Sequence, residues 1–187
     1  MVVPPTSHVS ASEKAGLRRM LRANRRAFSA EHVFSAHAAL YDRIAHSQII
    51  VGYWPVTGEP DVRPFLGSAA QRGVVTGLPR LEFNSTKMTF HQWIEGDATE
   101  NYRTFEQPLE SAALIIPDLI LAPLVGFDRA LNRLGQGGGH YDRAFLAYPN
   151  AYKIGIAWSV QEVPAVPVEA HDIALDAIMT EKEWITL

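Results

Sequence analysis

The sequence predicts a single α/β domain with three layers, in which helices cover both faces of a mostly parallel, mixed sheet. Short apolar segments that suit buried strands alternate along the chain with amphipathic segments of helical length. The chain has 187 residues, 47% of them hydrophobic, which is enough for one complete core. No internal repeat, low-complexity tract or linker divides it. We therefore expect a flexible tail at residues 1–9 and one domain at residues 10–187.

A strongly basic helix is expected first. Ser10, followed three residues later by Glu13, has the spacing of a capping box, so the helix should begin there. Its basic residues are Lys14, Arg18, Arg19, Arg22, Arg25 and Arg26. Two interpretations remain open: these charges form a solvated helix face, or they point cations at a bound polyphosphate. Lys14 and Arg18 project from one face in either case.

The remaining segments alternate between the two kinds of element. We expect helices at residues 29–47, 61–73 and 140–148. Buried strands are expected at 48–54, 74–78, 152–158 and 176–180, a half-exposed strand at 87–93, and a central buried segment at 114–125. His37 should lie at the edge of the core, on the apolar side of the 29–47 helix.

The composition excludes several classes of function. A formal net charge of −3 gives no reason to expect nucleic acid as a partner. The chain has no cysteine, which excludes disulfides, zinc–thiolate sites and thiol nucleophiles. No apolar run reaches 18 residues, and the first ten residues lack the pattern of a secretory signal. We therefore expect a cytoplasmic protein without a membrane partner.

A glycine-rich loop is the most informative feature of the chain. Gly135, Gly137, Gly138 and Gly139 run directly into the expected helix at 140–148. Glycines allow backbone N–H groups to turn inward, and a helix N-terminus adds positive potential, so the loop predicts an anion cradle, most plausibly for phosphate. The loop matches neither the P-loop nor the dinucleotide fingerprint. Arg133, Asp142 and Arg143 around it suit a phosphate with its metal ion.

Three polar segments should meet where the strands of a parallel sheet end: residues 58–61, the glycine loop, and residues 168–176. Glu59 is well placed there to meet a ligand. Asp142, together with Asp172 or Asp176, offers hard oxygen ligands for Mg²⁺. The histidines have no metal-ligand spacing, and a serine nucleophile elbow is absent.

Residues 121–128 (LAPLVGFD) and 132–143 (NRLGQGGGHYDR) resemble the signature of the 5-formyltetrahydrofolate cyclo-ligases, also called 5,10-methenyltetrahydrofolate synthetases. Other segments are similar to further parts of that family, so the resemblance covers nearly the whole chain. They are the basic helix with Lys14, Leu17, Arg18 and Arg26, the acidic turn at 58–61, the loop at 101–108 and the closing motif at 171–180.

The resemblance implies a three-layer α/β/α fold and the ATP- and Mg²⁺-dependent conversion of 5-formyltetrahydrofolate to 5,10-methenyltetrahydrofolate, with release of ADP and phosphate. It implies a phosphorylated formyl intermediate and no covalent nucleophile from the protein. It assigns the nucleotide to Lys14, Arg18, Arg133, Leu134, Gly135, Gln136, Gly137, Gly138, Gly139, His140 and Tyr141. It assigns the folate to Trp54, Glu59, Gln136, Gly138 and His140, and the Mg²⁺ to Asp142 and Asp172.

Two positions depart from the family pattern. His140 replaces the first tyrosine of the usual Gly-Tyr-Tyr-Asp, and Gln136 stands where an aromatic or basic residue is common. Two other readings therefore remain open: a non-catalytic relative that binds nucleotide or folate, and an ATP-dependent enzyme that acts on another formylated substrate. The expected partners are small molecules, and the protein is expected to be a monomer or a homodimer.

Overall fold

The computed structural model describes residues 11–83, 85–169 and 172–187. In these residues the central sheet has eight strands and is mostly parallel, as predicted. In sheet order the strands are β12 (Trp184–Ile185), β11 (Ala177–Met179), β10 (Tyr152–Ile156), β7 (Leu119–Pro123), β1 (Ile49–Val51), β2 (Val75–Leu81), β3 (Met88–Gln92) and β6 (Leu114–Ile115). The five strands from β11 to β2 are parallel, whereas the pairings of β12, β3 and β6 are antiparallel.

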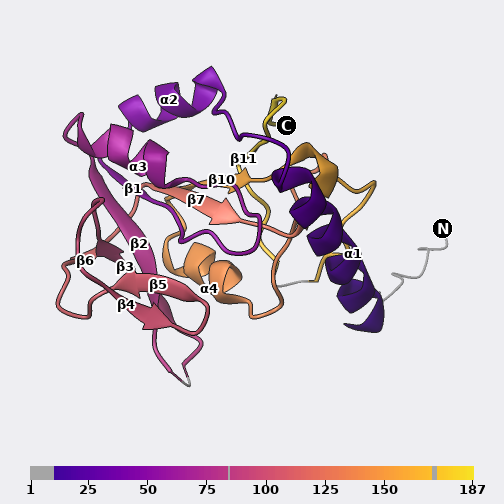
Figure 1. Cartoon of the computed structure of the whole chain (residues 1–187), viewed down its shortest axis with the longest axis horizontal. Helices are drawn as coiled ribbons and strands as arrows, with labels where there is room; N and C mark the ends of the chain where they lie inside the picture. The colour runs from indigo at the N-terminus through magenta and orange to yellow at the C-terminus, as the bar shows by residue number, and fades with distance from the viewer. Residues whose placement is uncertain (1–10, 84, 170–171) are drawn as a thin grey trace, which may run out of the picture.

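Helices cover both faces of this sheet, which confirms the predicted fold class. On one face, α2 (Ala38–Ala45) and α3 (Arg63–Ala70) share a core with Leu119 and Leu121 of β7. On the other face, α4 (His140–Ala147) shares a core with Ile120 of the same strand. Side chains alternate between the two faces of a strand, so β7 is buried on both sides and must be apolar throughout. The layers are visible in Figure 1.

The basic helix α1 (Ala11–Ser29) belongs to neither layer. Its residue Leu21 packs against Leu134 and Val163, at the short hairpin of β8 (Gly126–Phe127) and β9 (Arg133–Leu134) and the segment beyond η1 (Ser159–Gln161). A Cβ at Gly126 would lie 2.5 Å from the Leu21 side chain, so only glycine allows this close approach.

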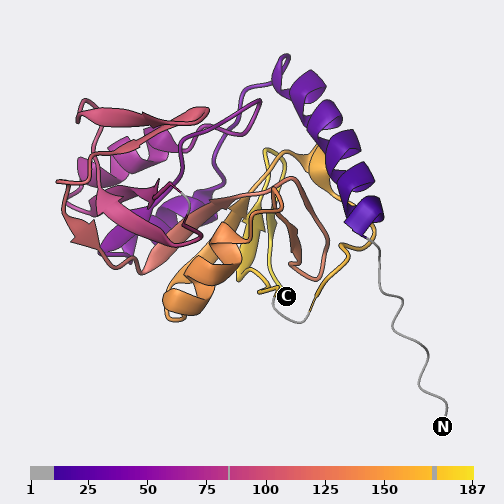
Figure 2. The same cartoon turned by 90° about the horizontal axis from the view of Figure 1, so that it is seen from below.

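A second hairpin, β4 (Thr99–Tyr102) and β5 (Phe105–Pro108), lies at the opposite end of the molecule from α1 in both views (Figures 1 and 2). Its turn contains Arg103 at a φ of 55°, a conformation that is unusual for a residue with a side chain. The helix and the hairpin therefore flank the space beyond the ends of the parallel strands. Among the described helices, none combines the length and the apolar character needed to cross a bilayer.

The helix predicted at residues 29–47 is wrong in its first half. Helix α1 ends at Ser29 and α2 begins only at Ala38, with non-helical chain between them. His37 is exposed rather than at the core edge, and its Nδ1 accepts a hydrogen bond from the N–H of Ala39 as the cap of α2. The chain must turn here because α1 lies at the rim of the sheet and α2 on its face.

The central segment at residues 114–125 is not one strand. Its first part is β6 at the sheet edge and its second part is β7 at the sheet centre, and Pro117, which has no N–H for a ladder, lies between them. Strand β3 is more buried than predicted, since Phe90 and His91 are both buried. The predicted capping residue Ser10 and the predicted tail lie outside the described residues.

Candidate functional site

A cavity of about 820 Å³ opens between α1, the glycine loop and the β4–β5 hairpin. Its size is that of a cofactor site. Every residue that the sequence assigned to nucleotide, folate or metal lines this one cavity: Lys14, Arg18, Trp54, Glu59, Arg133, Leu134, Gly135, Gln136, Gly137, Gly138, Gly139, His140, Tyr141, Asp142 and Asp172. Segments that are far apart in the chain thus converge beyond the ends of the parallel strands, as expected for this class of sheet.

The basic helix turns one face towards the cavity. Lys14, Arg18, Arg22 and Arg25 follow one another at intervals of three or four residues and all line it, whereas Arg19 does not. The Nζ of Lys14 lies 2.7 Å from Oε1 of Glu169. The Nε of Arg18 donates to the carbonyl of Gly135 at 2.9 Å. These four cations therefore line the cavity rather than a solvated outer face of the helix.

The glycine loop is built as a cradle of backbone amides. Gly137 and Gly139 have φ values of 104° and 62°, which favour glycine, and Gly139 precedes the first residue of α4. Arg143, which also lines the cavity, holds the loop by donating to the carbonyl of Gly138 at 2.6 Å. Within the described residues, the N–H groups of residues 137–141 have no hydrogen-bond acceptor. They are therefore available to an anion.

Arg133 and Asp142 form a nearly buried ion pair beside the loop. The Nη2 of Arg133 lies 2.8 Å from Oδ1 of Asp142, and the two side chains are 5% and 16% exposed. The guanidinium carbon lies 5.6 Å from the ring centre of Tyr141. The hydroxyl of Tyr141 is buried without a partner in the described part of the chain, and burial raises its pKa. This hydroxyl is a donor that a ligand can satisfy.

The carboxylates fit a metal ion that arrives with phosphate. Asp142 and Asp172 both line the cavity, whereas Asp176 pairs with Lys153 at 3.4 Å and does not. The described residues contain no group of three His, Cys, Asp or Glu side chains that could cage a metal by themselves. Mg²⁺ commonly takes one or two protein carboxylates and completes its shell with water and phosphate oxygens. Asp172, rather than Asp176, is therefore the second candidate ligand.

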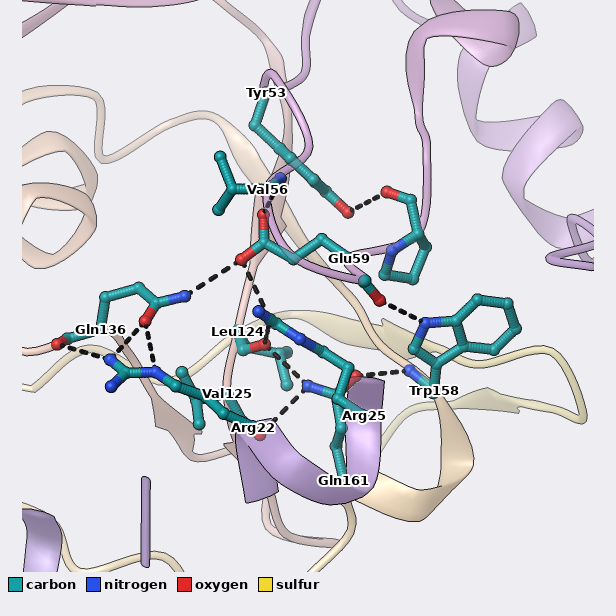
Figure 3. A network of polar contacts seen from close by, with 12 residues as sticks. Arg22, Arg25, Tyr53, Val56, Glu59, Leu124, Val125, Gln136, Trp158 and Gln161 are labelled. Atoms are coloured by element: carbon teal, nitrogen blue, oxygen red, sulfur yellow. Dashed lines mark hydrogen bonds and ion pairs between the residues drawn. The ribbon is translucent and has the colours of Figure 1, made fainter. Parts of the chain in front are cut away.

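Glu59 is the centre of a buried polar network (Figure 3). Its Oε1 lies 3.0 Å from Nη1 of Arg25 and accepts from Nε2 of Gln136 at 3.1 Å. Its Oε2 accepts from the N–H of Val56 at 3.1 Å. Burial raises the pKa of Glu59, and the charge of Arg25 opposes that shift. The network presents a fixed carboxylate to the cavity.

Trp54 forms the cavity wall beside Glu59. It meets Trp93 edge to face at 6.2 Å, and the guanidinium carbon of Arg63 lies 4.5 Å from the centre of its ring. Arg63 also pairs with Asp61, which lines a separate cavity of about 360 Å³. The acidic turn at residues 58–61 thus contributes Glu59 to the larger cavity, whereas the carboxylate of Asp61 turns towards Arg63.

His140 stands at the outer rim of the cavity. Its Nδ1 lies 3.3 Å from the carbonyl oxygen of Thr86 and therefore carries the hydrogen, because a carbonyl only accepts. Burial lowers the pKa of His140, the hydrogen bond to Thr86 opposes that shift, and the nearby charges of Arg143 and Arg103 lower the pKa further. The net direction favours the neutral imidazole.

The sequence assigned no site role to some of the cavity residues. Arg22 and Arg25 were noted only as basic residues, although they continue the spacing of Lys14 and Arg18 along one helix face. The turn of the β4–β5 hairpin, residues 102–105, also lines the cavity. In the sequence, the only indication of this was that the loop at residues 101–108 resembles a part of the cyclo-ligase family. The closing motif was assigned from residue 171, which lies outside the described residues.

Comparisons with known proteins agree on one family. The family model described as the 5-formyltetrahydrofolate cyclo-ligase family matches residues 10–181. The 5-formyltetrahydrofolate cyclo-ligase of Mus musculus is 28% identical over 200 residues, which cover 91% of this chain and 94% of the mouse protein. The enzyme of the same name from Escherichia coli K12 is 28% identical over 181 residues, covering 88% of this chain and 99% of its own.

Solved structures share the fold. The NMR structure of Aquifex aeolicus 5,10-methenyltetrahydrofolate synthetase superposes with a TM-score of 0.69 at 23% identity and covers 92% of both chains. The corresponding protein of Mycoplasma pneumoniae gives a TM-score of 0.59 at 23% identity and covers 92% of this chain and 90% of its own. Because both proteins are only 23% identical to this chain, the comparison shows a shared three-layer fold and no more.

Proposed function

Because the chain belongs to the 5-formyltetrahydrofolate cyclo-ligase family, a family of ligases, we propose that it converts 5-formyltetrahydrofolate to 5,10-methenyltetrahydrofolate and consumes ATP. One observation carries the proposal. A single cavity is lined by cations and glycine-loop amides, with Lys14 among the cations, and also by the carboxylate of Glu59 and the indole of Trp54. The cations and amides suit a triphosphate, and the carboxylate and indole suit a pterin ring, whose amino group and ring N–H are donors.

The proposed reaction has two bond-forming steps. The formyl oxygen takes the γ-phosphoryl group of ATP, and the bond to ADP breaks. N10 then attacks the activated formyl carbon, the carbon–oxygen bond to phosphate breaks, and N10 gives up its proton. No enzyme side chain is covalently bonded at any stage.

The chain's own residues supply position and charge. Lys14, Arg18 and the amides of residues 137–141 neutralise and orient the phosphates, and Glu59 orients the pterin. Phosphoryl transfer depends mainly on such positioning and electrostatic stabilisation. The arrangement therefore suits this chemistry without a nucleophile.

Asp142 and Asp172 would hold Mg²⁺ at the phosphates. The ion would neutralise charge that develops on the phosphate oxygens. The ion pair with Arg133 fixes the position of the Asp142 carboxylate at the cavity wall.

The test uses purified protein with Mg²⁺, ATP and 5-formyltetrahydrofolate. We expect the near-ultraviolet absorbance of the methenyl product to rise with one ADP released for each product formed. ADP release without methenyl product would instead indicate an ATP-dependent enzyme for another formylated compound. Binding of both substrates without turnover would indicate a non-catalytic relative, and His140 would then be the first position to change to tyrosine.

A further inference from the structure

In Figure 3, the side chain of Gln136 lies between Glu59 and Arg22 and contacts both. Its Nε2 donates to Oε1 of Glu59 at 3.1 Å. Its Oε1 accepts from Nη2 and Nε of Arg22 at 2.5 and 3.0 Å. Its carbonyl oxygen accepts from Nη2 of Arg22 as well, at 3.3 Å. The amide thus joins the carboxylate assigned to the pterin to a cation of the basic helix.

The bridge occupies an acceptor position that a substrate needs. An ionised carboxylate offers about four lone-pair sites, two on each oxygen. Arg25 and Gln136 fill both sites of Oε1, and the N–H of Val56 fills one site of Oε2. A ligand with two parallel N–H donors, such as the amino group and ring N–H of a pterin, needs one site on each oxygen. Only one of the two oxygens can then receive it.

Of the three groups that fill those sites, Gln136 is the one that can leave. The side chain of Arg25 is 1% exposed and fixed in the core, and the N–H of Val56 belongs to the backbone. Gln136 is exposed and stands between Gly135 and Gly137, the second of which has a φ of 104°. When the Gln136 side chain moves away, its amide remains in solvent and is not left buried without a hydrogen-bond partner.

We propose that Gln136 blocks bidentate recognition by Glu59 until nucleotide binds, and that it thereby couples the two substrate sites so that nucleotide raises the affinity for folate. This inference rests on the proposed function, since it takes ATP and a pterin as the two ligands. It assigns to Gln136 a specificity and coupling role.

Nucleotide releases the amide through Arg22. The guanidinium of Arg22 lies close enough to Arg25 and Arg18 that their charges, after burial, lower its pKa. Such a cluster of like charges favours an anionic partner over a neutral amide. Hydrogen bonds between a guanidinium and a phosphate are stronger than those to a neutral oxygen. A triphosphate in the cradle therefore draws Arg22 from Gln136, and the amide loses the contacts that hold it against Glu59.

The test measures the dissociation constant of 5-formyltetrahydrofolate by calorimetry, with and without Mg²⁺ and the non-hydrolysable analogue adenylyl imidodiphosphate. For the unaltered protein, we expect the analogue to tighten folate binding by at least about 5-fold, the lower end of ordinary coupling. By linkage, folate must tighten the analogue by the same factor. In Gln136→Met, which keeps the length and removes the amide, folate should bind without analogue as tightly as it does to the unaltered protein with analogue.

The matched control is Gln71→Met, the same substitution at an exposed glutamine that does not line the cavity. It should keep the full coupling factor. Equal folate affinity with and without analogue in the unaltered protein would overturn the inference, as would a Gln136→Met variant that keeps the coupling or binds folate more weakly. These outcomes leave the proposed function standing. Failure of the unaltered protein to bind either compound would overturn the proposed function and the inference together.

Discussion

The Nη1 atom of Arg25 lies 3.0 Å from Oε1 of Glu59, and the two side chains are 1% and 3% exposed. This pair joins the basic helix α1 to the turn that follows β1, across 34 residues of sequence. Arg25 also donates to the carbonyl of Leu124 at 3.3 Å. Arg25 therefore ties α1 to the chain that follows β1 and β7, in addition to lining the cavity.

Arg25→Ala should destabilise the protein strongly, because it leaves the Glu59 carboxylate buried without its cation. We expect the free energy of unfolding to fall by about 3–5 kcal/mol in urea titrations at pH 7. Arg19→Ala, an exposed residue of the same helix, should change it by no more than about 0.5 kcal/mol. Adding Glu59→Gln to Arg25→Ala should recover part of the loss. A loss below about 1 kcal/mol in the single variant would show that Glu59 is not held by Arg25.

Asp142→Asn should remove turnover and leave the fold in place. The amide oxygen still accepts from Arg133, but the charge that would hold Mg²⁺ is gone. We expect kcat to fall by about 100-fold or more, with little change in the urea midpoint. Asp176→Asn, at a carboxylate outside the cavity, should leave kcat unchanged. Equal effects of the two substitutions would remove Asp142 from the catalytic centre.

Lys14→Ala should weaken nucleotide binding. A hydrogen bond to a charged group is worth about 1.5–3 kcal/mol, so the KM for ATP should rise by about tenfold or more. The KM for 5-formyltetrahydrofolate should change much less, because Glu59 and Trp54, and not Lys14, are the proposed contacts of the pterin. Arg19→Ala again serves as the control for a cation on the same helix. A shift confined to the folate KM would contradict the proposed placement of the phosphates.

His140 should make stability depend on pH below neutrality. Its pKa in the folded protein is lower than the ordinary value of 6.5, chiefly through burial, so the unfolded chain binds the proton first as pH falls. Stability contributed by the neutral imidazole is complete above pH 6.5 and is lost as pH falls towards the folded pKa. Urea titrations between pH 7 and 5 should show the unaltered protein losing stability relative to His140→Asn. If stability depended on pH in the same way in both proteins, His140 would have the same pKa in the folded and the unfolded state.

Two glycine-to-alanine substitutions should change the free energy of unfolding in opposite directions. Gly139→Ala places a side chain at a φ of 62° and a Cβ 2.9 Å from Nη1 of Arg143, so it should cost about 1–2 kcal/mol. Gly16→Ala lies within α1 with nothing within 4 Å of the new Cβ, and it should add up to about 1 kcal/mol. Urea titrations of both variants test the conformation of the loop independently of any ligand.

Most of the fold could be predicted from hydrophobic period and turn chemistry. The strands of the parallel centre and the helices α3 and α4 lie where the sequence placed them, with shifts at their ends. Strands β8, β9 and β12 were not predicted because two-residue segments carry no period. The β4–β5 hairpin was not predicted either, because residues 101–108 were expected to form a loop. The first half of the 29–47 helix was wrong because the apolar positions of this segment happen to fit a helical period. In the structure this half is non-helical, and its residue Phe34 contacts Trp158 and Phe65.

By itself, the sequence determined the local pieces of this protein: the glycine turn before α4, the basic stripe of α1 and the apolar strands between them. These pieces follow from residue type and spacing within a few positions. Only the tertiary structure decided that Arg25 faces inward to Glu59 and that Gln136 reaches the same carboxylate from 77 residues away. Those contacts depend on how α1 packs against the β8–β9 hairpin, and no local period encodes the packing of elements that meet only in the folded chain.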